Sequence, residues 1–208
     1  THAAQNERVI AVLNAGEVQL EKNGKATFQN ILVLDDSEVE AWLSEHALQR
    51  EISFKVGDED RYGRSQIVSE LQEKMLRDGV VVLYATDGDV PANWRAAEAA
   101  ARAEKRGVWA SESLLTAPEK ALALKGGFHV VEGVITRIYE SKVGTYINFG
   151  EDWRSDFSVT ISPKLRRGMK AFLAGLKEGD RVRVRGSMVQ ENGPMIRLNH
   201  ADNLEIIH

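Results

Sequence analysis

Short segments rich in β-branched and aromatic residues alternate with clusters of turn residues along residues 128–198, and their order limits the fold. Three strands are expected first, then one helix, then two more strands. The strands are expected at Val130–Tyr139, Gly144–Phe149, Asp156–Ile161, Arg181–Val189 and Met195–Leu198, and the helix at Pro163–Ala174. Asn192-Gly193-Pro194 is typical of a hairpin turn between the last two strands. The block therefore predicts a small domain made mainly of strands.

This order of three strands, one helix and two strands is that of a five-stranded OB-type barrel. The first part of the chain also begins with strands, and helices are interleaved with later ones. Strands are expected there at 8–13, 17–20, 26–34, 51–56, 66–69 and 80–84, and helices at 37–48, 70–78 and 92–106. Residues 111–127 are mostly Ser, Ala, Leu, Glu and Lys and include a Gly-Gly pair, so they are predicted to be a linker.

The chain contains no cysteine among its 208 residues. This excludes a disulfide framework, thiolate zinc sites, iron–sulfur clusters and a cysteine nucleophile, and it leaves the cellular compartment open. The five histidines are spread out without an i, i+4 pair, which argues against a histidine-based metal site. No stretch approaches the ~20 apolar residues of a transmembrane helix, so we expect no membrane-spanning segment.

The net charge of −4 at pH 7 hides an asymmetry between two parts of the chain. Residues 127–208 hold 12 Lys and Arg against 10 Asp and Glu, a net charge of +2, which leaves −6 on residues 1–126. Because acidic surfaces repel phosphates, the first part is the poorer candidate for binding a polyanion.

Two motifs in the first part are similar to those of a known family. Asp60-Arg61-Tyr62-Gly63-Arg64 and the segment WRAAEAAARAEKRGVW at 94–109 resemble the D-[KR]-Y-G-R turn and the last helix of the staphylococcal nuclease (thermonuclease) family. The resemblance covers about residues 8–110. It implies an OB-type barrel with flanking helices at 1–110, before the linker at 111–127 and a second OB-like barrel at 128–208. The expected fold class is mainly β with helices (α+β), as two tandem small OB-type β-barrels.

The resemblance implies Ca²⁺-dependent phosphodiester cleavage, in which two arginines stabilise phosphoryl charge, aspartates hold the metal and a glutamate helps to activate water. Arg64 occupies the position of the second arginine. The other positions hold different residues: Gln29 for the first arginine, Gly16 and Leu34 for aspartates, and Ser37 for the glutamate. Glutamine has neither the charge nor the guanidinium fork that binds phosphate. The sequence therefore predicts a degenerate nuclease site.

Two interpretations of the nearby acidic residues stay open. A one-residue shift places Asp35 and Glu38 at the aspartate and glutamate positions, and Glu17 then replaces the ligand lost beside Gly16. The chain would then be a Ca²⁺-dependent endonuclease with rearranged metal ligands, with Arg64 and Glu38 as catalytic residues. Otherwise the acidic residues cap the helix expected at 37–48. Arg64 is then a structural arginine that pairs with the acidic residues 58–60.

Aromatic and basic residues gather in the second block. OB-type barrels bind single-stranded nucleic acid by stacking bases on such aromatics within a basic groove. The candidate nucleic-acid-binding residues are Tyr146, Phe149, Trp153 and Arg154 near the first hairpin, and Arg183 and Arg185 on one face of a later strand. The alternative is that the aromatics are core residues and the arginines form a solvated face.

The leading expectation is a nuclease-derived binding or scaffolding protein whose partner is single-stranded nucleic acid. One alternative is the endonuclease acting on DNA or RNA, for which Ca²⁺ is the cofactor. The other is a protein–protein interaction module, because barrel surfaces also serve that role. Members of the family are often exported, so the resemblance implies a periplasmic or secreted location.

Overall fold

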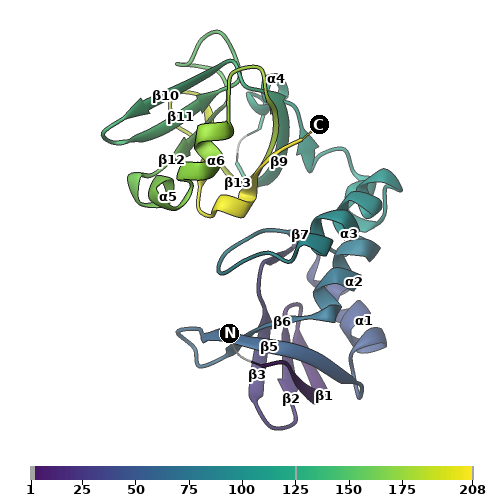
Figure 1. Cartoon of the computed structure of the whole chain (residues 1–208). Coiled ribbons are helices and arrows are strands. Elements are labelled where there is room, and N and C mark those ends of the chain that lie inside the picture. Colours follow the sequence, from purple (N-terminus) through teal and green to yellow (C-terminus); the bar gives the residue numbers. More distant parts are fainter. Residues whose placement is uncertain (1–2, 125, 208) are drawn as a thin grey trace. The chain divides into compact units, whose positions relative to one another are not determined.

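The computed structural model describes residues 3–124 and 126–207 and shows an α+β protein (Figure 1). The chain divides into two compact units, residues 1–110 and 111–208, which we call unit 1 and unit 2. Each unit has its own cluster of buried apolar side chains. Within the described ranges, no helix is long and apolar enough to cross a membrane.

Unit 1 is built around a closed five-stranded barrel (Figure 1). Its strands are β1 (Gln5–Asn14), β2 (Glu17–Leu20), β3 (Gly24–Phe28), β5 (Glu51–Glu59) and β6 (Ser65–Ser69). The first three strands form an antiparallel meander, and β3 pairs with β6 in parallel. The barrel closes because β5 pairs with both β6 and β1. Val9, Val18 and Phe54 fill its interior, as side chains do in small barrels.

Three helices accompany this barrel: α1 (Asp36–His46), α2 (Glu70–Asp78) and α3 (Ala92–Ala103). β4 (Ile31–Val33) and β7 (Val81–Leu83) form a separate two-stranded sheet, and a 3₁₀ turn covers Gly107–Ala110. The single strand expected over 26–34 is wrong. Asn30 has a φ of 60° and splits it, and its side chain bonds to Thr86 and Asp87 on a distant loop.

Unit 2 contains an eight-stranded sheet. Its strands are β8 (Leu115–Thr116), β9 (Phe128–Val134), β10 (Arg137–Ser141), β11 (Gly144–Asn148), β12 (Ser158–Ile161), β13 (Arg181–Gln190), β14 (Pro194–Leu198) and β15 (Leu204–Ile206). The antiparallel pairs β10–β11 and β11–β12 are followed by a parallel pair, β12–β14, and then by the antiparallel pairs β14–β13 and β13–β9. Unit 1 shows the same succession of pairings.

One strand and one helix of unit 2 are interrupted, although the sequence predicted each of them to be continuous. The strand expected over 130–139 breaks at Ile135 and Thr136, whose backbone N–H groups donate to Asp180 O and Asn148 O. The helix expected over 163–174 forms two short helices, α5 (Pro163–Gly168) and α6 (Lys170–Gly175), and a 3₁₀ turn covers Ala201–Asn203. β9 and β10 are therefore two consecutive strands separated by this two-residue break.

Part of the segment 111–127, expected as a linker, packs within unit 2. β8 pairs in parallel with β9. The short helix α4 (Pro118–Ala121) follows, and Ala121 is fully buried in the core of the unit.

Candidate functional site

Arg64 closes the tight turn that connects β5 to β6. Asp60 organises this turn, because its carboxylate accepts the backbone N–H groups of Tyr62 and Arg64 at 2.8 and 3.0 Å. Gly63 has a φ of 70°, a left-handed conformation that glycine adopts without strain. The same Asp60 carboxylate also accepts from Nε and Nη2 of Arg64, each at 2.6 Å. The turn therefore positions the guanidinium through local bonds.

Glu17, at the start of β2, holds the other side of this guanidinium. Its Oε2 lies 2.8 Å from Nη1 of Arg64, and its side chain is only 8% exposed. Desolvation opposes ionisation of Asp60, but the hydrogen bonds from the Arg64 side chain and from two backbone N–H groups outweigh it and lower the pKa of Asp60. Hydrogen bonds from Glu17 and then Asp60 raise the pKa of Arg64. Two carboxylates thus pair with the partly exposed guanidinium of Arg64.

The remaining candidates of unit 1 do not join this cluster. Gln29 is buried and donates through Nε2 to Oε1 of Gln66 at 2.9 Å. Asp35 is the N-cap of α1, and its Oδ1 accepts the backbone N–H of Glu38 at 3.0 Å. Of the acidic residues 58–60, Asp60 is the one that pairs with Arg64, and the side chain of residue 58 lies outside what the structure describes.

These carboxylates do not fit a calcium site. Ca²⁺ takes about six to eight oxygen ligands, usually with several carboxylates. The Glu17 oxygens face Arg64 and, at 3.8 Å, the Nζ of Lys25, whereas Asp35 caps a helix. Within residues 3–124 and 126–207, no three His, Asp or Glu side chains gather in a way that could hold a metal ion.

In unit 2, Arg183 and Arg185 are part of an internal ion cluster. Arg183 lies between Glu132 and Glu205, with N–O distances of 2.6 and 2.8 Å. Arg185 is 1% exposed and reaches the same Glu205 at 3.2 Å. Both arginines therefore pair with the protein's own carboxylates, which argues against the prediction that they offer a basic face to a nucleic acid. The strand register explains this, because it sets Glu132 and Glu205 directly opposite Arg183 on the two neighbouring strands.

A hollow of about 540 Å³, which we call the groove, lies over β10, β11 and β12. Two of the candidate aromatics line it, Tyr146 and Trp153. The full lining is Arg137, Tyr139, Ser141, Val143, Tyr146, Asn148, Trp153, Ser158, Asn192 and Met195. Phe149 does not line it, because it packs on Phe157 in the core at a ring distance of 5.1 Å. The structure thus separates the predicted aromatics into groove and core residues.

The loop between β11 and β12 presents Trp153 to the groove. Asp152 organises this loop: its carboxylate accepts the Arg154 N–H and the Ser155 hydroxyl, and its backbone N–H donates to Asp156 Oδ2. Trp153 stays 51% exposed, and the guanidinium carbon of Arg154 lies 4.6 Å from its ring centroid. A large aromatic ring is therefore held out in solvent beside a cation.

Arg137 and Tyr139, which were not among the residues predicted from the sequence, line the groove from β10. Tyr139 is 53% exposed, and its ring centroid lies 6.4 Å from that of Tyr146, its direct cross-strand neighbour. The signal was present, because Arg137, Tyr139 and Ser141 recur at the two-residue spacing that places side chains on one face of a strand.

Residues 36–111 match the family model described as staphylococcal nuclease homologue, and this part of the chain is such a domain. The match confirms the resemblance stated for the first part of the sequence. It includes Arg64 and begins after Gly16, Gln29 and Leu34, where the sequence departs from the family's catalytic pattern. A search of the curated proteins found no match to the chain.

Proposed function

We propose that this protein binds single-stranded nucleic acid in the groove of unit 2 and that unit 1 is a nuclease-derived scaffold without cleavage activity. The observation that carries the proposal is the set of three aromatic rings, Tyr139, Tyr146 and Trp153, that line one groove. Two of them are more than half exposed. Each base stacked on such a ring contributes about 1–3 kcal/mol to binding, whatever its identity.

The topology of unit 2 supports this assignment. The pairings lead from β10 through β11, β12, β14 and β13 to β9, and β9 and β10 are consecutive halves of one strand path. We therefore interpret unit 2 as a second OB-type barrel in tandem with the first. In such barrels, ligands bind the face of the second and third strands between the loops that follow strands one and four. Val143 and Asn192 lie in the corresponding loops and both line the groove.

The charges in the groove favour a polyanion. Arg137 lines it and is exposed, and Arg154 lies against the ring of Trp153. A guanidinium beside an aromatic ring offers a base both a stacking surface and a cation. The nuclease homologue domain agrees with this choice, because that family acts on nucleic acids.

The geometry of unit 1 favours a non-catalytic role. Arg64 would have to stabilise developing charge on a phosphoryl group, and such a contribution is worth on the order of 10²–10³ in rate. Glu17 and Asp60 already neutralise it, and the first arginine of the family is replaced by the buried Gln29. A negative substrate would have to displace two carboxylates to reach the guanidinium.

The test is the affinity of the full chain for a labelled oligothymidylate, measured by fluorescence anisotropy at low salt. We expect Trp153→Ala to weaken binding by at least about fivefold, from the loss of one stacking contact. Tyr62→Ala is the matched control, because Tyr62 is a 66% exposed aromatic in the Arg64 turn of unit 1. A loss with Tyr62→Ala alone would place the contact at unit 1, and equal losses in both variants would show that the groove is not the specific site. Either result would contradict the proposal. Absence of binding by the wild type would favour a protein–protein interaction module.

A further inference from the structure

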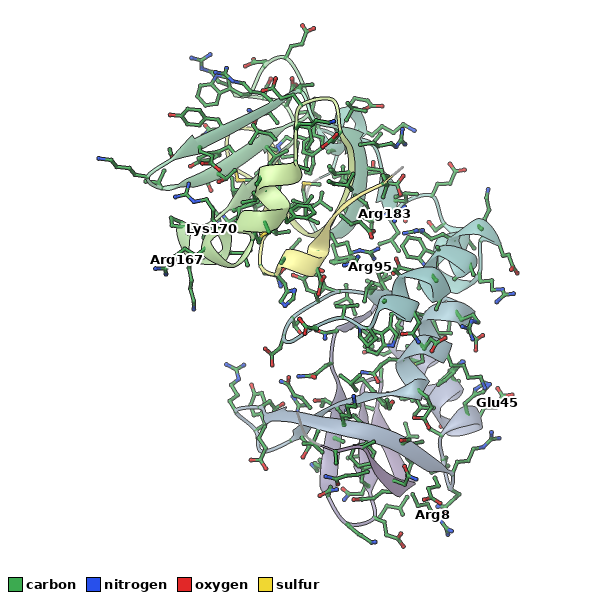
Figure 2. The ribbon with its side chains drawn as sticks, in the orientation of Figure 1. Arg8, Glu45, Arg95, Arg167, Lys170 and Arg183 are labelled. Atoms are coloured by element: carbon green, nitrogen blue, oxygen red, sulfur yellow. The ribbon has the colours of Figure 1, made fainter. Side chains whose placement is uncertain are left out.

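Three exposed cations lie on the two short helices of unit 2. Lys164 and Arg167 are three residues apart on α5, which places them on one side of the helix, and Lys170 begins α6. Figure 2 labels Arg167 and Lys170, whose side chains come from these helices on the outside of the unit. Residues 163–175 contain no Asp or Glu. We call these three side chains the ridge.

The ridge cations are not engaged by acidic side chains. In the part of the chain that the structure describes, no carboxylate forms an ion pair with Lys164, Arg167 or Lys170. By contrast, the neighbouring Arg166 is occupied, because its Nη1 donates to Ser141 O at 2.9 Å. The ridge cations thus differ from Arg64 and Arg183, each of which is paired with two carboxylates.

A second hollow continues from the groove towards the start of α5, although the ridge cations themselves line neither hollow. This second hollow of about 220 Å³ shares Val143, Tyr146 and Met195 with the groove and extends to Ser162. Ser162 is the N-cap of α5, so it directly precedes the helix that carries Lys164 and Arg167. The bond from Arg166 to Ser141, which lines the groove, fixes α5 at this end.

The groove is short compared with an extended strand of nucleic acid. It follows β10 from Arg137 to Ser141, which is about 14 Å at the rise of a β-strand. OB-type barrels cover about 4–16 nucleotides depending on the protein. A strand longer than a few nucleotides must therefore leave the groove. The second hollow, whose lining includes the ion pair of Arg197 with Glu191, offers an exit towards the start of α5.

We infer that a single strand of nucleic acid stacked in the groove continues across the second hollow to the ridge, where Lys164, Arg167 and Lys170 contact its phosphates. This inference rests on the proposed function and adds a second, purely electrostatic subsite. The ligand is then a polyanionic strand longer than the groove, and not a mononucleotide.

The experiment compares two labelled oligothymidylates, of about 4 and about 16 nucleotides, the limits of the site size of one barrel. The test variant is Lys164→Gln/Arg167→Gln/Lys170→Gln in the full chain. Lys120→Gln is the control, because Lys120 is an exposed cation of the same unit that lies on α4, whereas the second hollow extends to Ser162, the N-cap of α5. All four positions are exposed, so the variants should fold, which unfolding curves check.

We expect the triple variant to bind the long oligonucleotide roughly tenfold more weakly and the short one within about twofold of the wild type. The slope of log K against log salt for the long oligonucleotide should become less steep by about 0.7 for each lost contact, or about 2 in total. Lys120→Gln should change neither value.

Two results would overturn the inference while leaving the proposed function intact. One is an unchanged slope and affinity for the long oligonucleotide when Trp153→Ala still weakens it. The other is an equal loss for both lengths in the triple variant. Failure of the wild type to bind either oligonucleotide would instead remove the proposed function itself.

Discussion

The Oε2 atom of Glu17 lies 2.8 Å from Nη1 of Arg64, and the carboxylate that makes this contact is almost buried. The arginine of a nuclease homologue domain is therefore paired with the protein's own anion on one side and with Asp60 on the other. The pairing predicts a structural role for Arg64 that can be tested separately from any catalytic one.

Replacing Arg64 with Ala should destabilise the protein by about 1–3 kcal/mol. Among the described residues, the variant leaves only Lys25, at 3.8 Å, to compensate the charge of Glu17. The partial exposure of the pair keeps the cost below that of a fully buried one. Urea denaturation measures the change. Arg61→Ala, in the same turn but exposed, should stay within about 0.5 kcal/mol of the wild type. Equal stabilities of the two variants would show that the pair contributes nothing to folding.

The lowered pKa of Asp60 should appear as a loss of stability in acid. Because the folded-state pKa is below the unfolded-state value of about 3.9, the stabilisation is present above that value and is lost as the pH falls through the folded-state pKa. The free energy of unfolding of the wild type should therefore decrease more steeply below about pH 4 than that of Asp60→Asn. Parallel pH profiles for the two proteins would contradict the assignment.

Calcium should neither stabilise the protein nor support cleavage. A specific site raises the melting temperature, because binding to the folded state adds RT ln(1 + [L]/Kd) to stability. The melting temperature with millimolar CaCl₂ should equal that with EDTA, and single- and double-stranded DNA and RNA should stay intact. Cleavage that EDTA abolishes and Arg64→Ala removes would establish the endonuclease alternative. A melting temperature raised by Ca²⁺ alone would show a metal site without catalysis.

Arg183 should matter for folding and not for ligand affinity. Arg183→Ala removes the cation shared by Glu132 and Glu205 and leaves them the longer contacts to Arg181 and Arg185, which we expect to cost about 2–4 kcal/mol. Arg181→Ala is the control on the same face of β13, because its side chain is 58% exposed and 3.8 Å from Glu132. Folded Arg183→Ala protein should bind oligothymidylate as the wild type does. A weaker affinity at unchanged stability would show that Arg183 contributes to nucleic-acid binding.

The strand order of unit 2 was predictable from the sequence because hydrophobic alternation and turn residues are local signals. The ion pairs of Arg183 and Arg185 were not predictable from the sequence. Alternation along one strand cannot show that the registers with β9 and β15 place acidic residues beside these arginines. The break at Ile135 and Thr136 was not predictable either, because the backbone hydrogen bonds from these residues to Asp180 and Asn148 join segments that are distant in the sequence.

The candidate site was predictable to a similar extent. The nuclease turn at 60–64 is a contiguous motif and was visible, whereas its partner Glu17 lies 47 positions away from Arg64. The aromatics of the groove were found where they cluster in sequence, at Tyr146 and Trp153. Tyr139 was missed because its place beside Tyr146 depends on the register of β10 with β11.

Gly193→Ala should weaken nucleic-acid binding by displacing the loop that presents Trp153. Gly193 has a φ of 92°, and a Cβ atom there would lie 2.4 Å from the backbone oxygen of Ser155, two residues after Trp153. Because that contact is with backbone, the loop itself must shift.

Gly179→Ala is the matched control, since Gly179 has a φ of 90° but nothing within 4 Å of an added Cβ. Both variants should lose about 1–2 kcal/mol of stability from the left-handed conformation, yet only Gly193→Ala should reduce the affinity for oligothymidylate, as measured by anisotropy. An unchanged affinity in Gly193→Ala would mean that the position of Trp153 is not important for binding.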